Sequence, residues 1–168
     1  MIKAVIFDFD GTLVHLQIDY DKLFKELSKI TRIKNVRPLT KVTAQLDEET
    51  KQKAFNVWNR IELEAITNMK VNSEGMAHYQ RFLEKRKALV TMQGKPFLEI
   101  ALKRLGISFD YIVTREDSLD RVKQLEIAAK KLRTLAQNIL FIGNTDGDMI
   151  AAKNFGCQFL RVKNESLV

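Results

Sequence analysis

The chain opens with an apolar segment that runs directly into acidic residues. Residues 2–7 (IKAVIF) are rich in β-branched side chains and do not alternate between apolar and polar positions. This pattern predicts a strand that is buried on both faces. Asp8 and Asp10 follow it, separated by one phenylalanine. A buried strand that ends in two carboxylates needs a physical reason.

From about residue 20 to residue 86 the apolar positions recur at helical spacing. Arg37-Pro38 interrupts the run, a shorter helix is predicted over 39–46, and Asn72-Ser73 provides an N-cap for the last helix. The apolar stripes are formed by Leu23, Leu27 and Ile30, by Ala54, Trp58, Ile61 and Ala65, and by Met76, Tyr79, Phe82 and Leu83. We therefore expect a helical insertion over residues 15–86.

After residue 87 strand and helix patterns alternate. The predicted strands are 88–92, 109–114, 138–143 and 157–162, and the predicted helices are 96–106, 122–132 and 148–156. Such alternation is typical of a parallel sheet with helices on both faces. We therefore expect an α/β core of Rossmann-like type, formed by residues 1–14 and 87–168, with the helical segment inserted after the first strand.

Composition narrows the function classes. The lone cysteine, Cys157, excludes an internal disulfide framework and favours a reducing, cytoplasmic setting. No apolar run approaches the ~20 residues of a membrane helix, and Asp8 interrupts the N-terminal apolar stretch, so neither a membrane span nor a signal peptide is expected. The net charge of +7 is scattered along helical faces, which favours a solvated basic surface over a nucleic-acid surface. A basic field would equally suit a small anionic substrate.

The two acids sit where an α/β sheet binds its ligands, beyond the carboxyl end of a strand. Two carboxylates about 4 Å apart repel by roughly 4 kcal/mol at an effective dielectric near 20. A fold keeps Asp8 and Asp10 together when a cation or a shared proton compensates this repulsion. A hard, oxygen-preferring ion such as Mg²⁺ suits them.

Two further strand ends carry matching chemistry. Thr91 ends the predicted strand 88–92 and supplies a hydroxyl. Asn144, Asp146 and Asp148 follow the strand 138–143 in a glycine-rich turn. Acids after two strands, with a hydroxyl and turn amides after a third, predict a site for Mg²⁺ and a phosphate group.

These segments together resemble the motifs of the haloacid-dehalogenase-like (HAD) phosphohydrolases. DFDGT resembles the first motif, LVT with Thr91 the second, and GNTDGD the fourth. The helical insertion falls where this family places a small helical cap. The phosphoglycolate-phosphatase-like branch is the group that the chain is most similar to, and the resemblance covers most of its length.

The resemblance implies a role for each matching position. Asp8 matches the nucleophile that forms an aspartyl-phosphate, and Asp10 matches the general acid and base. Thr91 matches the hydroxyl that binds a phosphoryl oxygen, and Asp148 the second acid of the metal motif. The implied Mg²⁺ ligands are Asp8, Asp10, Asn144 and Asp148, and the implied substrate contacts are Thr91, Gly11 and Lys123.

The chain departs from the family pattern at two motifs. Asn144 stands where an acid usually binds the metal, so the metal affinity should be lower. In the third motif Lys123 comes at the right point, but the proline-containing segment after it is missing. We expect Lys123 to neutralise Asp8 and the phosphate, with Arg121 as the second candidate; the alternative is that Lys123 is a surface lysine.

The sequence therefore predicts a Mg²⁺-dependent phosphatase of a small phosphorylated metabolite, monomeric or homodimeric. A phosphomutase would use the same acids and stays open. A non-catalytic family member that binds a phosphorylated ligand, a nucleic acid or a protein is also considered, because of Asn144 and the shortened third motif. A phosphorylated receiver domain also uses acids at strand ends, but it would not carry a helical insertion directly after the first strand.

Overall fold

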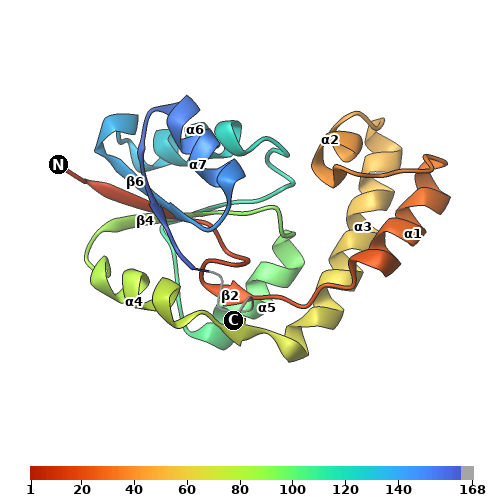
Figure 1. Cartoon of the computed structure of the whole chain (residues 1–168), viewed down its shortest axis with the longest axis horizontal. Helices are drawn as coiled ribbons and strands as arrows, with labels where there is room; N and C mark the ends of the chain where they lie inside the picture. Colours follow the sequence, from red (N-terminus) through yellow and green to blue (C-terminus); the bar gives the residue numbers. More distant parts are fainter. Residues whose placement is uncertain (164–168) are drawn as a thin grey trace.

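The centre of the molecule is a parallel sheet (Figure 1). The computed structural model describes residues 1–163, so the last five positions of the expected core, 164–168, lie outside the described residues. The strands are β1 (Ala4–Phe7), β4 (Arg86–Val90), β5 (Tyr111–Val113), β6 (Ile139–Gly143) and β7 (Gln158–Arg161). They pair in the order β5-β4-β1-β6-β7, and every neighbouring pair is parallel. The predicted Rossmann-like α/β class with an inserted helical segment is confirmed.

Helices cover both faces of this sheet. Val5 and Phe7 of β1 pack on one face and Ala4 and Ile6 on the other, and all of them are fully buried, as the unbroken apolar run predicts. The covering helices are α4 (Ser73–Arg81) and α5 (Lys95–Leu105) on one face, and α6 (Arg121–Leu132) and α7 (Asp146–Phe155) on the other. The central position of β1 puts its carboxyl end in the middle of one sheet edge.

The inserted helices stand beyond this carboxyl edge and have a core of their own (Figure 1). They are α1 (Tyr20–Thr31), α2 (Leu39–Ala44) and α3 (Glu48–Glu64), followed by the short 3-10 helix η1 (Ala65–Asn68). Their shared core contains Leu23, Leu27, Ala54, Phe55, Trp58 and Ile61. At the base of the insertion β2 (Val14–His15) pairs antiparallel with β3 (Lys70–Val71), so the chain leaves and re-enters the core at one place.

The helix α4 packs on the sheet, although the sequence pattern assigns it to the insertion. The Tyr79 ring contacts Phe7 at a centroid distance of 6.1 Å. Asn72, its N-cap, donates from its backbone to the Leu13 carbonyl (2.9 Å) and from its side chain to the Gly11 carbonyl (3.3 Å). We therefore propose that the insertion spans about residues 16–71 instead of 15–86, and that α4 belongs to the core.

Gly75 on α4 lies so close to the loop after β1 that a side chain has no room. A Cβ atom there would lie 1.7 Å from the Thr12 carbonyl oxygen. We expect Gly75→Ala to lower the free energy of unfolding by about 1–3 kcal/mol, measured by urea denaturation, because the helix must move away from the loop. Gly147→Ala on α7 is the matched control, since its Cβ would meet nothing closer than 3.6 Å. Equal stability of the two variants would contradict this close packing.

Helix ends follow the predicted chemistry with one correction. Asn72 caps α4 through its side chain, as predicted, and Gly106 ends α5 in the left-handed conformation. The helix α7, however, starts two residues before the predicted start at 148, with Thr145 as its N-cap and Asp148 at the third helical position. A second short 3-10 helix, η2 (Ala136–Asn138), precedes β6. Within residues 1–163, no helix combines the length and apolar character needed to cross a membrane.

Candidate active site

Asp8 follows β1 directly and is almost fully buried at the carboxyl edge of the sheet. Its backbone amide donates to the Ile142 carbonyl of β6 (2.9 Å), so the neighbouring strand fixes its position. Beyond it the chain turns sharply: the Gly11 amide donates to the Val14 carbonyl (2.7 Å), and Gly11 has a φ of +81°. This turn, residues 8–14, is called the first-motif loop below.

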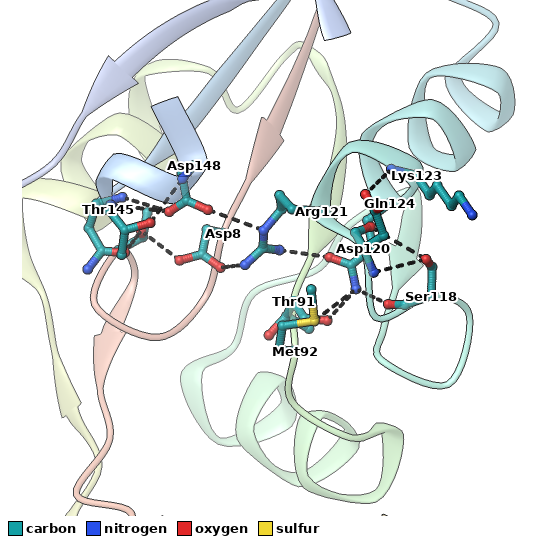
Figure 2. A network of polar contacts seen from close by, with 12 residues as sticks. Asp8, Thr91, Met92, Ser118, Asp120, Arg121, Lys123, Gln124, Thr145 and Asp148 are labelled. Carbon is teal, nitrogen blue, oxygen red and sulfur yellow. Dashed lines mark hydrogen bonds and ion pairs between the residues drawn. The ribbon is translucent and has the colours of Figure 1, made fainter. Parts of the chain in front are cut away.

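Arg121 joins Asp8 to Asp148 (Figure 2). Its Nη2 donates to Asp8 Oδ1 (3.0 Å), and its Nε lies 3.2 Å from Asp148 Oδ1. Its Nη1 donates to Gln124 Oε1 (2.8 Å), which fixes the guanidinium group from the other side. One cation thus bridges acids that follow two different strands.

Lys123 does not take the position that we expect from the sequence. Its side chain is exposed and points away from Asp8, while its backbone amide donates to Asp120 Oδ1 (3.1 Å), the N-cap of α6 (Figure 2). Arg121 is the first residue of the same helix, and its side chain reaches back over the sheet edge. The described structure therefore favours the second candidate, Arg121, for the cationic role.

Asp148 is buried and held by backbone amides. Its Oδ2 accepts from the amides of Asn144 (3.3 Å) and Thr145 (3.2 Å), and the Thr145 hydroxyl accepts from the Asp148 amide (3.0 Å). These reciprocal bonds form a capping box at the start of α7. The arrangement leaves Oδ1 of Asp148 directed at Arg121.

The Asn144 side chain lies against the first-motif loop. Its surroundings orient the amide nitrogen inward, where it donates to Asp8 Oδ2 (3.2 Å), to the Asp10 carbonyl (3.3 Å) and to the Thr12 hydroxyl (3.3 Å). Gly11 makes this approach possible, since a Cβ there would lie 2.1 Å from the Asn144 amide. Asn144 thus contacts the loop, as its place after β6 implies.

Burial changes the acidity of both acids of the first motif. Burial and the nearby Asp148 raise the pKa of Asp8 to about 7, although Arg121 acts in the opposite direction. Burial also raises the pKa of Asp10 to about 6, against the hydrogen bond that its Oδ1 accepts from the Leu16 amide (3.0 Å). Asp10 can therefore hold or release a proton near neutral pH. Asp8 needs additional positive charge to stay ionised.

Thr91 follows β4 and is fully buried. Its hydroxyl bonds to the Gln93 side chain and accepts from the Gln93 amide (3.1 Å). Its carbonyl accepts from Gln124 Nε2 (2.8 Å), and the same nitrogen donates to the Ser118 carbonyl (2.9 Å) (Figure 2). Gln124 therefore connects the Thr91 loop to Arg121, a link that the sequence pattern did not reveal.

A buried ion pair joins the insertion to the core. Arg115, after β5, has its Nη1 2.8 Å from Glu62 Oε1 of α3, and neither side chain is exposed. Arg115 also donates to the Met92 carbonyl (2.8 Å) and lies over the Trp58 ring at 4.2 Å. Glu62 Oε1 accepts in turn from the Gly94 amide (3.1 Å). The loop that follows Thr91 is thus held by both partners of this pair.

One feature of the sequence indicates this ion pair. Glu62 lies four residues after Trp58, on the apolar stripe of the predicted helix, where a charge needs a partner. The partner, Arg115, is 53 positions away in sequence, in the segment TRED at residues 114–117. Periodicity alone therefore indicates a buried acid but cannot identify the arginine.

The oxygen atoms around the first-motif loop are suitable ligands for an oxygen-preferring divalent cation. A carboxylate oxygen of Asp8 and the Asp10 carbonyl lie within 3.3 Å of the Asn144 amide, whose own oxygen can also bind a metal. Within residues 1–163, no cluster of three or more His, Cys, Asp or Glu side chains forms a metal site. The cation would therefore be bound mainly by Asp8, the Asp10 carbonyl and the neutral Asn144.

The predicted residues after β1 and β6 meet at one edge, whereas those from the other motifs do not all join them. Asp8 and Asp148 share Arg121, and Asn144 contacts Asp8. Thr91 lies on the adjacent strand with its hydroxyl engaged by Gln93, and Lys123 points away. Thr12, which the motif match did not single out, donates its hydroxyl to Asp8 Oδ2 (3.2 Å).

Comparison with known proteins finds a family model and a curated relative that match nearly the whole chain. A family model described as haloacid dehalogenase-like hydrolase matches residues 5–162. A protein of Clostridium perfringens, provisionally named as the pyrophosphatase PpaX, is 27% identical over 188 residues, which cover 99% of this chain and 86% of that protein.

Solved structures share the fold at lower identity. A haloacid dehalogenase-like family hydrolase from Streptococcus pneumoniae superposes with a TM-score of 0.69 at 20% identity, covering 95% of this chain and 84% of that one. CbbY from Rhodobacter sphaeroides, solved in complex with phosphate, superposes with a TM-score of 0.69 at 14% identity, covering 97% of this chain and 87% of that one.

Proposed function

The chain belongs to the haloacid dehalogenase-like hydrolase family, and we propose that it is a phosphatase that acts on a small phosphorylated metabolite through Asp8. The observation that carries the proposal is the buried Asp8–Arg121–Asp148 group at the carboxyl end of the central strand. A buried carboxylate beside a fixed cation is suited to attack an anionic phosphoryl group, because the cation offsets the repulsion between them.

In the first step a carboxylate oxygen of Asp8 attacks the phosphorus, and the bond from phosphorus to the leaving oxygen breaks. Asp10 donates its proton to that oxygen, so the product leaves as an alcohol. The pKa of Asp10, raised by burial to about 6, supports this role. The result is a phosphoryl group bound covalently to Asp8.

In the second step Asp10, now a carboxylate, takes a proton from a water molecule. The water oxygen forms a bond to phosphorus, and the bond between phosphorus and Asp8 breaks. Inorganic phosphate leaves, and Asp8 and Asp10 return to their starting states. Arg121 stays hydrogen-bonded to Asp8 Oδ1 in the resting site, which holds the carboxylate in its orientation.

We propose that a divalent metal, Mg²⁺ by preference, takes part when bound. Asp8, the Asp10 carbonyl and Asn144 would hold it, with Asp148 nearby. It would supply positive charge between the nucleophile and the phosphate. The pKa of Asp8, raised by burial to about 7, supports this need, because Arg121 alone leaves the carboxyl only partly ionised at neutral pH.

The insertion supports a small substrate. Its helices stand over the carboxyl edge of the sheet, and the buried Glu62–Arg115 pair ties α3 to the loop after Thr91. A covered site of this kind excludes polymers and bulk water. The cytoplasmic setting is also part of the proposal, supported by the free thiol of Cys157, which fits a reducing compartment.

The proposal is tested by phosphate release from a panel of small phosphate esters, pyrophosphate and acetyl phosphate, with Mg²⁺ and with EDTA. We expect release from at least one compound, stronger with Mg²⁺, and transient labelling of the protein by ³²P from that substrate. Interconversion of two phosphate esters without release would establish a phosphomutase. Binding without any turnover of folded protein would establish a non-catalytic binding protein.

Matched variants of Arg121 and Lys123 test which of the two residues supplies the positive charge beside Asp8. We expect Arg121→Met to lower kcat/KM by about 10²–10³-fold, because it removes a fixed cation from the reacting carboxylate. Lys123→Met should stay within about twofold of the wild type, since its side chain points to solvent. Steady-state kinetics on the best substrate of the panel measures both; a larger loss in Lys123→Met would restore the original assignment.

A further inference from the structure

The Asp8 carboxylate is satisfied on both of its oxygens by this chain alone. Arg121 donates to Oδ1 (3.0 Å). The Thr12 hydroxyl (3.2 Å) and the Asn144 amide nitrogen (3.2 Å) face Oδ2. The same amide nitrogen lies 3.3 Å from the Asp10 carbonyl oxygen, which can only accept a hydrogen bond. Asn144 therefore links two acceptors that would otherwise face each other across the first-motif loop.

A donor or a cation suits this position better than an oxygen. Asp8 Oδ2 and the Asp10 carbonyl are both acceptors, so an oxygen placed there accepts only from the Thr12 hydroxyl and faces the other two oxygens without a hydrogen bond. An amide nitrogen solves this with its N–H groups, whereas a carboxylate at position 144 has nothing to donate. A carboxylate there would also be a third acid beside Asp8 and Asp148, with Arg121 as their shared partner.

We propose that Asn144 completes the hydrogen bonding of the site in the absence of metal: its amide nitrogen takes the place of a divalent cation between Asp8 and the Asp10 carbonyl, and its amide oxygen serves as a weak ligand when the cation enters. Turning the amide exchanges donor for acceptor in the same position. The metal-free site is thus fully assembled, and metal binding must replace existing hydrogen bonds. The consequence is a stable apo protein with a low affinity for Mg²⁺.

Asn144→Asp tests this exchange in two measurements that need no turnover. In EDTA we expect its Tm to fall by about 4 °C or more, because the amide donor is replaced by a third carboxylate. Isothermal titration should show Mg²⁺ bound at least about tenfold more tightly than by the wild type, since a charged ligand replaces a neutral one. Mg²⁺ should restore the lost Tm in this variant and change that of the wild type little.

Two further variants keep the test decisive. Asn154→Asp makes the same chemical change on the exposed part of α7, and neither its Tm nor its Mg²⁺ affinity should differ from the wild type. Asn144→Ala removes the donor without adding charge, so its Tm should fall in EDTA and Mg²⁺ should not restore it. If Asn144→Asp folds only with Mg²⁺, the proposal is supported in its strongest form.

The proposal is overturned if Asn144→Asp is as stable as the wild type in EDTA, if its Mg²⁺ affinity is unchanged, or if Mg²⁺ stabilises the wild type as much as the variant. It concerns the same site as the proposed phosphatase but does not depend on turnover. The predicted shifts in a protein that releases no phosphate would uphold this inference and refute the phosphatase. Phosphate release without the shifts would do the reverse.

Discussion

Asp8→Asn is expected to reduce phosphate release by at least about 10⁴-fold while the protein stays folded. The amide cannot form the acyl-phosphate bond, so the loss should appear in kcat with every substrate. The amide can still accept from Arg121 and donate to the Thr12 hydroxyl, and the Asn144 amide can turn so that its oxygen accepts from the new amide, so the surrounding fold is retained. Steady-state kinetics and circular dichroism measure the two parts. Asp146→Asn, an exposed acid paired with Arg161 at the start of α7, is the matched control.

The same variant should change how stability depends on pH. Burial raises the pKa of Asp8 from 3.8 to about 7 on folding, so the folded state keeps a proton that the unfolded state has lost. This contribution is fully present below pH 3.8 and disappears as the pH rises through about 7, at up to about 1.4 kcal/mol per pH unit. Asn titrates in neither state, so it does not lose this contribution. Urea denaturation should therefore show the free energy of unfolding of Asp8→Asn rising relative to that of the wild type between pH 5 and 8. A constant difference across that range would contradict the raised pKa.

Arg115→Met is expected to lower the free energy of unfolding by about 3–5 kcal/mol. The side chain supplies a positive charge to Glu62, a donor to the Met92 carbonyl and a cation over the Trp58 ring. Without it Glu62 must keep an unpaired buried charge or take up a proton, and both states disfavour folding. Burial already raises the pKa of Glu62 to about 7 despite Arg115, so the loss of the partner should raise it further. Urea denaturation at pH 7 measures the effect.

A double-mutant cycle separates the charge pair from simple packing. Adding Glu62→Gln to Arg115→Met removes the uncompensated acid, so the double variant should be more stable than Arg115→Met alone. Arg104→Met is the matched control: Arg104 also reaches from the core to the insertion, but from an exposed position to the Ile66 carbonyl (2.9 Å). It should change stability by no more than about 0.5 kcal/mol. A comparable loss in Arg104→Met, or strict additivity in the cycle, would contradict a coupled buried pair.

The layout of the core could be predicted because it follows from local patterns. The apolar run before Asp8 forms a strand buried on both faces, and the alternation after residue 87 forms the parallel sheet. Acids after parallel strands must meet at one edge, so Asp8 and Asp148 come together as expected. These conclusions need only the period of the pattern and the direction of the strands.

The remaining differences depend on details that a pattern does not contain. Arg121 and Lys123 are two residues apart on α6, which places their side chains about 200° apart around the helix, and the exact start of that helix decides which one faces Asp8. The stripe on α4 shows that the helix has a buried face, but not that this face meets Phe7 of the sheet. The turn of the Asn144 amide depends on partners from the first-motif loop, far away in sequence.

The short pairing of β2 with β3 gives the molecule a modular design. Val14 lies opposite Val71, and His15 opposite Lys70, so the inserted helices begin and end at a single point of the surface. Their ends are already joined by this ladder, and their apolar core is separate from those of the sheet. An insertion of this kind can be lengthened, shortened or exchanged without changing the order of the strands that carry Asp8 and Asp148. Different insertions can thus be combined with the same sheet edge. Selection for a new substrate can then act on the insertion while the residues at the sheet edge stay unchanged.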